Sequence, residues 1–270
     1  MSKFDIKPES LALESVHTPC LFSWQGKEAV LFIGTATHAT VRAEETYSLW
    51  LWLDGEEPQP VLDFGDSVCA PWIVKHGGGL RLYVCIRMGS IYRLAVFYGD
   101  SPDSWTFIDW CLPETTHWQW TPCVLKTGGH FRLFYCATDA QGGMFLKQAL
   151  SEDGVHFCND RYFTVPTPEG FYGQIKPALY KVSATDYALF LSAYYKDGVA
   201  LHLYKTQDLE RFEWIDRVFP ERKDVYKAHL YKGALIYVAA TEGLGSIRAE
   251  YIQLAEYVAD WLPYPDPVAL

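Results

Sequence analysis

The sequence lacks the features that would place the protein in a membrane or on a nucleic acid. No stretch approaches the roughly 18 apolar residues of a membrane-spanning helix, and the first residues contain no apolar signal region. Lys and Arg number 23 against 33 Asp and Glu, which gives a net charge of −10. Nucleic acids and anionic membranes attract basic surfaces, so neither is expected as a partner. We expect a soluble, cytoplasmic protein.

Motifs for metals and phosphates are also missing. The eight His show no HxxxH or HxH spacing, no CxxC pair occurs, and neither an EF-hand loop nor a P-loop is present. The glycine runs at 77–79 and 142–143 fall between strand-like segments and are interpreted as turns. Seven scattered Cys favour free thiols in a reducing compartment over a disulfide framework or a zinc site. We expect no metal and no cofactor.

Aromatic residues are abundant. Hydrophobic residues make up 49% of the chain, and ten Trp, eighteen Tyr and fifteen Phe bring the aromatic share to 16%. Aromatic side chains favour strands, whereas helical periodicity is essentially absent. The composition therefore predicts a folded, all-β protein.

A repeat of about fifty residues runs along the whole chain. Each copy begins with a small residue or Lys followed by Pro, or by Ala in the last copy, and an apolar run. The five anchors are Thr18-Pro19, Ala70-Pro71, Thr121-Pro122, Lys176-Pro177 and Lys227-Ala228. Polar turns at 101–107, 151–157 and 206–212 align without gaps and feed an outer strand.

The repeat predicts a single five-bladed β-propeller over 1–270, with four antiparallel strands in each blade. In the third repeat we place the strands near 119–126, 130–138, 144–150 and 156–161. A β-sandwich would not give an equal period, and solenoid coils are usually shorter. The outer strand of the last blade is left open between the segments 4–8 and 257–262. The expected blades span 17–63, 68–111, 119–161, 174–218 and 226–262.

The Pro anchors, the segment Ala70-Pro71-Trp72-Ile73 and the Ser-x-Asp turns resemble the five-bladed propellers of glycoside hydrolase family 43, which act on arabinans, xylans and similar glycans. The resemblance covers all five repeats and implies the fold more strongly than the chemistry. The family places a general-base Asp before the first Pro, a second Asp before the third, and an acid Glu two residues before the fourth. The corresponding residues here are Thr18, Thr121 and Ile175. Hydrolysis by an inverting glycosidase needs two carboxyl groups, so the family mechanism does not carry over unchanged.

In an antiparallel blade, the starts of the inner strands and the ends of the second strands share one face, at the mouth of the central channel. This placement selects the binding candidates without any homology. Aromatic rings there could stack on a sugar or another ring-containing metabolite, or pack the channel for stability. The candidates for substrate binding are Trp118, Trp120, Tyr172, Tyr226, Lys176, Lys227, Arg87 and His38.

Acid and base candidates lie on the same face. His17 could take a proton near neutral pH or could line the channel, bound to a backbone carbonyl. Lys176 and Lys227 recur at equivalent places and would depress each other's pKa, giving an amine nucleophile or an anion clamp, unless they form salt bridges. Trp72 follows its Pro and is expected in the core. The acidic candidates for catalysis, each of which could instead be a turn residue, are Asp66, Asp139, Glu169 and Glu242.

The sequence thus predicts a glycosidase-like propeller enzyme with a rebuilt active site. Its substrate would be a small glycan or a hydrophobic, ring-containing metabolite, and its chemistry either hydrolysis by relocated acids or non-hydrolytic acid–base chemistry such as that of a lyase or cyclase. The alternatives are a lectin-like binding propeller without catalysis and a scaffold for a protein partner. The sequence leaves the oligomeric state open.

Overall fold

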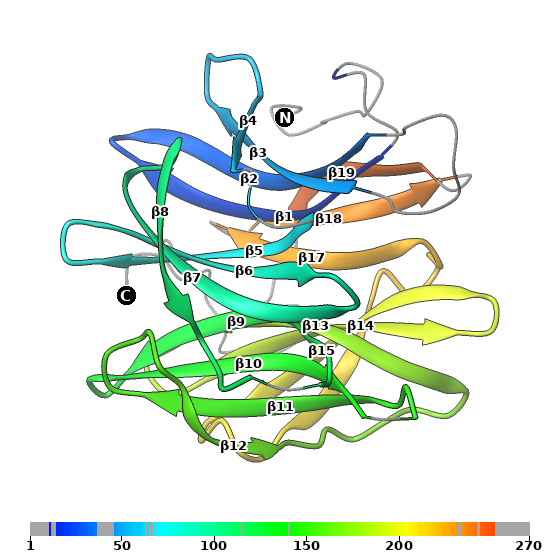
Figure 1. Ribbon diagram of the computed structural model, residues 1–270. Coiled ribbons are helices and arrows are strands. Elements are labelled where there is room, and N and C mark those ends of the chain that lie inside the picture. The colour runs from blue at the N-terminus through cyan, green and yellow to red at the C-terminus, as the bar shows by residue number, and fades with distance from the viewer. Residues whose placement is uncertain are drawn as a thin grey trace.

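The computed structural model describes residues 11, 15–36, 46–62, 64, 67–114, 116–139, 141–231, 234–241 and 244–251. These residues form five antiparallel sheets (Figure 1). No helix among them is long and apolar enough to cross a membrane. The strands of the first two sheets are β1 (Ser15–Trp24), β2 (Lys27–Ala36), β3 (Thr46–Leu53) and β4 (Gln59–Leu62), then β5 (Ser67–His76), β6 (Gly79–Met88), β7 (Ile91–Ser101) and β8 (Ser104–Trp110).

The remaining sheets follow in chain order. The third contains β9 (Gln119–Thr127), β10 (His130–Thr138), β11 (Met144–Ser151) and β12 (Cys158–Tyr162). The fourth contains β13 (Phe171–Lys181), β14 (Tyr187–Tyr195), β15 (Gly198–Thr206) and β16 (Glu213–Val218). The last sheet has three strands within the described residues, β17 (Val225–Tyr231), β18 (Ala234–Thr241) and β19 (Leu244–Tyr251).

The first strand of each sheet lies at that sheet's edge, and these inner strands contact one another in a closed ring. Contacts join β1 to β5, β5 to β9, β9 to β13, β13 to β17 and β17 back to β1. The largest core cluster lies between the sheets and draws on β5, β9, β13 and β17. This ring of sheets around a shared axis is a propeller, as the repeat predicted.

The prediction of four strands per blade holds for four of the sheets. The strands expected in the third repeat correspond to β9–β12 and are confirmed. In the last sheet only three strands lie among the described residues, and both segments considered for a fourth, 4–8 and 257–262, lie outside them.

Two-residue turns join the inner strand to the second strand in the first three sheets. The turn residues are Gln25-Gly26, Gly77-Gly78 and Gly128-Gly129, and all six have positive φ. Two consecutive residues with positive φ make the type I′ turn, whose twist matches that of the flanking strands. The interpretation of the first glycine run as a turn is therefore confirmed.

A β-bulge interrupts every inner strand at its anchor. The register shifts between His17 and Cys20, and at the equivalent place in β5, β9, β13 and β17. The residue before each Pro, or before Ala228, has a left-handed φ of 51 to 56°. Pro19 lies within β1 and not at its start. It is tolerated because a bulge leaves ladder bonds unmade and because β1 is an edge strand.

The left-handed backbone at the bulges predicts that a substitution by glycine, which usually destabilises a strand, does not lower the stability there. Ala70 is left-handed with φ 54°, a conformation that costs an L-residue about 1–2 kcal/mol and a glycine almost nothing. We expect Ala70→Gly to leave stability unchanged or to raise it by up to about 1 kcal/mol in urea unfolding. The control is Ala95→Gly in β7, which is also buried but lies in an ordinary strand. It should cost about 1 kcal/mol, and an equal loss at both sites would contradict the strain.

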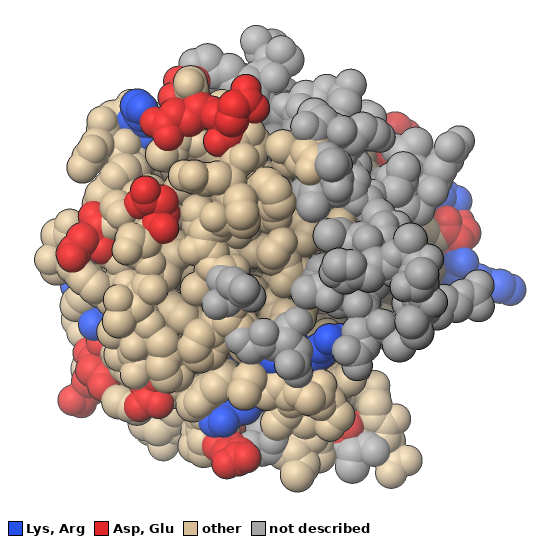
Figure 2. All heavy atoms as spheres, turned by 45° about the horizontal axis from the view of Figure 1, so that its top comes forward, with Lys and Arg blue, Asp and Glu red and all other residues tan. Residues whose placement is uncertain are grey.

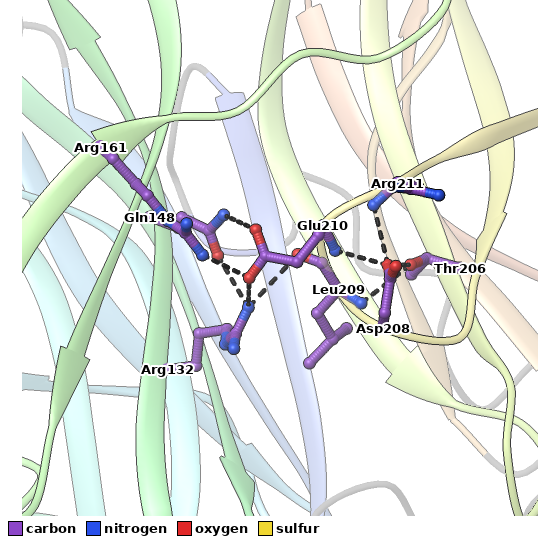
Figure 3. A network of polar contacts seen from close by, with 8 residues as sticks. All are labelled: Arg132, Gln148, Arg161, Thr206, Asp208, Leu209, Glu210 and Arg211. Atoms are coloured by element: carbon purple, nitrogen blue, oxygen red, sulfur yellow. Dashed lines mark hydrogen bonds and ion pairs between the residues drawn. The ribbon is translucent and has the colours of Figure 1, made fainter.

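The aligned polar turns join the third and fourth strands of a sheet, and two of them bind an Arg of the neighbouring sheet. In the fourth sheet, Asp208 Oδ1 accepts hydrogen bonds from the backbone N–H groups of Glu210 and Arg211, both at 2.8 Å (Figure 3). Arg132 of β10 reaches across to this turn and binds Glu210 Oε1 at 2.7 Å. Arg81 of β6 likewise donates to the carbonyl of Asp153 in the turn of the third sheet. The repeated turn thus binds the neighbouring sheet. These contacts fix the sheets relative to one another and so position the inner strands around the channel.

Candidate functional site

A cavity of about 420 Å³ opens at the bulged ends of the inner strands. Bulges re-aim side chains, and four of the five bulged residues line this cavity. Its lining is His17, Thr18, Tyr47, Cys69, Ala70, Tyr92, Trp120, Thr121, Met144, Ile175, Tyr194 and Lys227. The channel mouth selected from strand order therefore contains a real cavity.

Aromatic rings form one wall of the cavity. Tyr92 stacks on Trp120 with ring centroids 6.4 Å apart, and Trp118 meets both rings edge to face at 5.1 and 5.6 Å. Trp120 lines the cavity, whereas Trp118 is 37% exposed and lines a different one. Sugars and other rings present apolar faces that stack on such surfaces. Trp120 and Tyr92 thus provide a platform for a ring.

His17 faces the same cavity from β1. Its Nδ1 lies 2.8 Å from Thr18 Oγ1, and its ring meets Tyr47 edge to face at 5.3 Å. Burial, together with the charges of Lys227 and Lys176, lowers the pKa of His17 well below its usual value. The imidazole is therefore neutral at neutral pH and able to accept a proton.

Two lysines from equivalent bulges differ in where their amines lie. Lys227 lines the cavity, and its Nζ lies 5.3 Å from the centre of the Tyr226 ring. Lys176 is 4% exposed, and its Nζ has no hydrogen-bond partner among the described residues. Lys176 therefore forms no salt bridge to a described acid: Asp224 pairs with Arg222, and Glu169 is exposed in a turn.

The acidic candidates do not converge on His17. Asp139 lines a second cavity of about 440 Å³ beside the third sheet, together with Glu114 and Asp160. Its Oδ1 is occupied by the backbone N–H groups of Gln141 and Gly143, at 2.9 and 2.7 Å, so it caps a turn. No carboxylate is found among the described residues that line the cavity of His17.

The other candidates are distributed as follows. Asp66, Glu242 and His38 lie outside the described residues, as does the side chain of Tyr172. Tyr226 is half-buried beneath the Lys227 amine. Arg87 is the second-last residue of β6, and its charge and hydrogen bond oppose the raised pKa that burial gives Tyr92. In the view of Figure 2, acidic side chains gather toward the edge of the molecule, and the described surface between them is mostly uncharged.

Three cavity residues were missed by the sequence analysis. Tyr47, Tyr92 and Met144 lie at the start of β3, β7 and β11. The strand-order argument stopped at the end of the second strand, but the third strand starts at the same face across a hairpin. Extending the argument by one strand would have found all three residues.

The described residues contain no group of three or more His, Cys, Asp or Glu side chains that could hold a metal ion. Their cysteines are free, and five of the seven are buried. The described residues that line the cavity supply an imidazole, an amine, a thiol, hydroxyls and aromatic rings.

Comparison with known proteins gives the fold a name. No protein-family model matches the chain, and no curated protein matches it either. Among solved structures, a thermostable family 43 glycoside hydrolase has a TM-score of 0.71 at 10% identity, with 94% of this chain and 96% of that one covered. A family 43 β-xylosidase/α-arabinofuranosidase from a compost microbial metagenome has a TM-score of 0.69 at 13% identity, with 98% of each chain covered. An endo-arabinase from Bacteroides thetaiotaomicron has 0.69 at 12%, with 93% and 97% covered.

The chain has a family 43-like propeller fold. The likeness extends over almost the whole length of both chains, so it concerns the ring of sheets and not one blade. At such low identity it shows the fold alone. In this family 43-like propeller, Thr18, Thr121 and Ile175 all line the cavity at the inner-strand bulges.

Proposed function

We propose that this chain is a five-bladed propeller enzyme, the fifth blade containing β17–β19, with a family 43-like channel rebuilt for different chemistry. Its substrate is a small glycan or another ring-containing metabolite, and its reaction is acid–base chemistry without a carboxylate pair. We further propose one domain with blades at 17–63, 68–111, 119–161, 174–218 and 226–262. The placement of Thr18, Thr121 and Ile175 in the cavity supports the loss of the hydrolytic acids that the family resemblance implies.

The observation that supports this function best is the composition of the cavity. An aromatic platform of Trp120 and Tyr92 lies in the same 420 Å³ space as a neutral His17 and the Lys227 ammonium. A space of this volume accommodates a mono- or disaccharide or a molecule of similar size. The solved structures described above as a β-xylosidase/α-arabinofuranosidase and an endo-arabinase make pentoses and short pentose chains the first compounds to test.

His17 is the proposed base. When its Nδ1 carries the proton and donates to Thr18 Oγ1, Nε2 holds a lone pair that can take a proton from the substrate. Lys227 places a positive charge beside the developing negative charge on that substrate. Proton abstraction from the substrate, followed by elimination or ring closure, needs these two groups and does not need a pair of carboxylates.

The second candidate is a binding propeller without catalysis. The lack of a carboxylate among the described lining residues favours it, because the aromatic platform alone is enough for binding. The two functions differ at His17. An enzyme loses turnover when the base is removed, whereas a binding module loses only the affinity that this contact provides.

Calorimetry and product analysis test the proposal. The probes are L-arabinose, D-xylose, xylobiose, arabinobiose and the 4-nitrophenyl glycosides of both pentoses. We expect binding of at least one probe, a loss of affinity of about tenfold in Trp120→Ala from the lost stacking, and no release of nitrophenol. His17→Gln should retain binding and lose turnover by about a hundredfold or more.

The matched control is Tyr162→Ala, which alters an exposed aromatic ring in the second cavity and should change neither binding nor turnover. Nitrophenol release by the wild type would contradict the rebuilt site. Binding without any product, unaffected by His17→Gln, would establish the non-catalytic propeller instead.

A further inference from the structure

Lys176 occupies a position that polar side chains rarely hold. It is the bulged residue of β13, with φ 55°, and it is 4% exposed. Its Nζ reaches no hydrogen-bond acceptor among the described residues. A buried ammonium without a partner is costly, and proteins retain one where the amine has a chemical task or loses its proton.

The groups that face this amine are two imidazoles, three thiols and a second lysine. They come from the inner strands packed against β13, and no carboxylate is found among them in the described part of the chain. Cys136 of β10 contacts the backbone of Lys176. The facing groups are His17 and Cys20 on β1, Cys69 on β5, Cys123 on β9, and Lys227 and His229 on β17.

This environment favours the uncharged amine. Burial first, and the Lys227 charge second, lower the pKa of Lys176 from 10.5 to about 7. Burial holds the thiols of Cys20 and Cys123 protonated by raising their pKa, whereas a hydrogen bond with Cys85 lowers the pKa of Cys69. About half of the Lys176 amine is then neutral at pH 7, roughly a thousand times the fraction of an ordinary lysine.

The amine lies next to the cavity of His17. The bulged residues of the other four sheets line that cavity, and so does Ile175, the residue before Lys176. The facing groups belong both to residues before the anchor Pro, such as Cys69, and to residues after it, such as Cys123. Nζ is therefore buried between the inner strands next to the cavity, and rotation of its four-carbon stem would bring it to a bound ligand.

We propose that Lys176 is a covalent nucleophile that forms a Schiff base with the aldehyde or ketone carbonyl of a small molecule bound in this cavity. A desolvated lysine next to a second cation is the arrangement that makes an amine nucleophilic at neutral pH. The inference rests on the proposed ligand cavity and names the substrate class as a carbonyl compound, which includes a sugar in its open-chain form.

The reaction balances without any co-reactant. The Nζ lone pair forms the C–N bond while the carbonyl π electrons move to oxygen. Both amine protons end on that oxygen, which departs as water and leaves the imine. A proton from the neighbouring Lys227 ammonium converts the imine to an iminium, which withdraws electrons from the adjacent carbon, and the neutral His17 can accept the proton of that carbon. Water reverses the sequence and regenerates the amine.

Reductive trapping tests the proposal on the full chain. The protein is incubated at pH 7 with benzaldehyde and sodium cyanoborohydride, which reduces an imine to a stable secondary amine. Intact mass and peptide mapping then locate the adduct. We expect one benzyl group on Lys176 before any other lysine reacts, and a fall in labelling of at least about tenfold in Lys176→Met. Lys181→Met, on the same strand, is the control and should label like the wild type.

The pH dependence separates a nucleophile from a merely reachable lysine. Labelling of Lys176 should rise with a midpoint near its pKa of about 7. Lys227→Met removes the neighbouring charge and should move that midpoint to higher pH. Equal labelling of many lysines, or an unchanged adduct in Lys176→Met, would overturn the proposal.

The outcomes also separate this inference from the proposed function. Pentose binding that Trp120→Ala weakens, with no adduct on Lys176, overturns the Schiff base and leaves the proposed function standing. An adduct on Lys176 with no binding of any pentose or pentoside probe supports the nucleophile and overturns the proposal that the cavity binds a glycan.

Discussion

Replacing Lys176 by methionine is expected to stabilise the protein by about 3–5 kcal/mol at pH 6. A fall in pKa from 10.5 to about 7 in the folded state corresponds to about 5 kcal/mol. At pH 6 the amine is protonated in both states, so folding buries an ammonium that has no described partner. Methionine has a similar length and no charge, and it removes this cost.

The sign of the pH dependence follows from the lowered pKa. Between pH 7 and 10.5 the unfolded chain keeps a proton that the folded protein has lost, so the stability of the wild type rises with pH. Above pH 10.5 both states are neutral, and the advantage of Lys176→Met should fall to the small difference in packing. Urea unfolding of both proteins at pH 6, 8 and 9.5 measures this convergence.

The control variant is Lys181→Met, which replaces a half-buried lysine of the same strand and should show no convergence with pH. A lower stability of Lys176→Met at pH 6 would mean that the ammonium is paired in the folded protein. In that case the neutral amine on which the Schiff base depends does not exist.

The ring of sheets was predictable because it is a property of the repeat. The anchors recur about every fifty residues, and each one became the bulge of an edge strand beside the channel. The same alignment put His17, Trp120 and Lys227 at one mouth, where they now line one cavity. The repeat period was enough to place these residues together, because consecutive antiparallel strands alternate in direction and the inner strands therefore all start at the same face.

The interior of the site was not predictable to the same depth. Lys176 and Lys227 look equivalent in the sequence, yet one amine is buried beside the cavity and the other lines it. Side-chain direction at a bulge depends on packing between blades, which the repeat does not encode. Asp139 lies in a second cavity, where a tight turn uses its carboxylate for backbone N–H groups, a local arrangement that a strand-level prediction cannot resolve.

Trp72→Ala is expected to destabilise the protein by about 3–5 kcal/mol, the usual cost of removing a large buried aromatic side chain. Trp72 lies on β5 and is 5% exposed, as expected of a core residue. Its Nε1 donates to the carbonyl of Val124 on β9 at 2.9 Å, and its ring packs on Tyr180 of β13 at 5.6 Å and on His229 of β17 at 5.4 Å. One side chain thus joins the inner strands of four sheets.

Trp118→Ala is the matched control for this prediction. Its Nε1 also donates to a backbone carbonyl at 2.9 Å, that of Ser90, but the side chain is 37% exposed. We expect it to cost about 1 kcal/mol in urea unfolding, so the difference between the two variants measures burial and not the hydrogen bond. Trp72→Phe should fall between them, because it keeps most of the packing and loses the donor. Equal losses in both alanine variants would mean that contacts between blades at the channel contribute little, and that each sheet holds its shape alone.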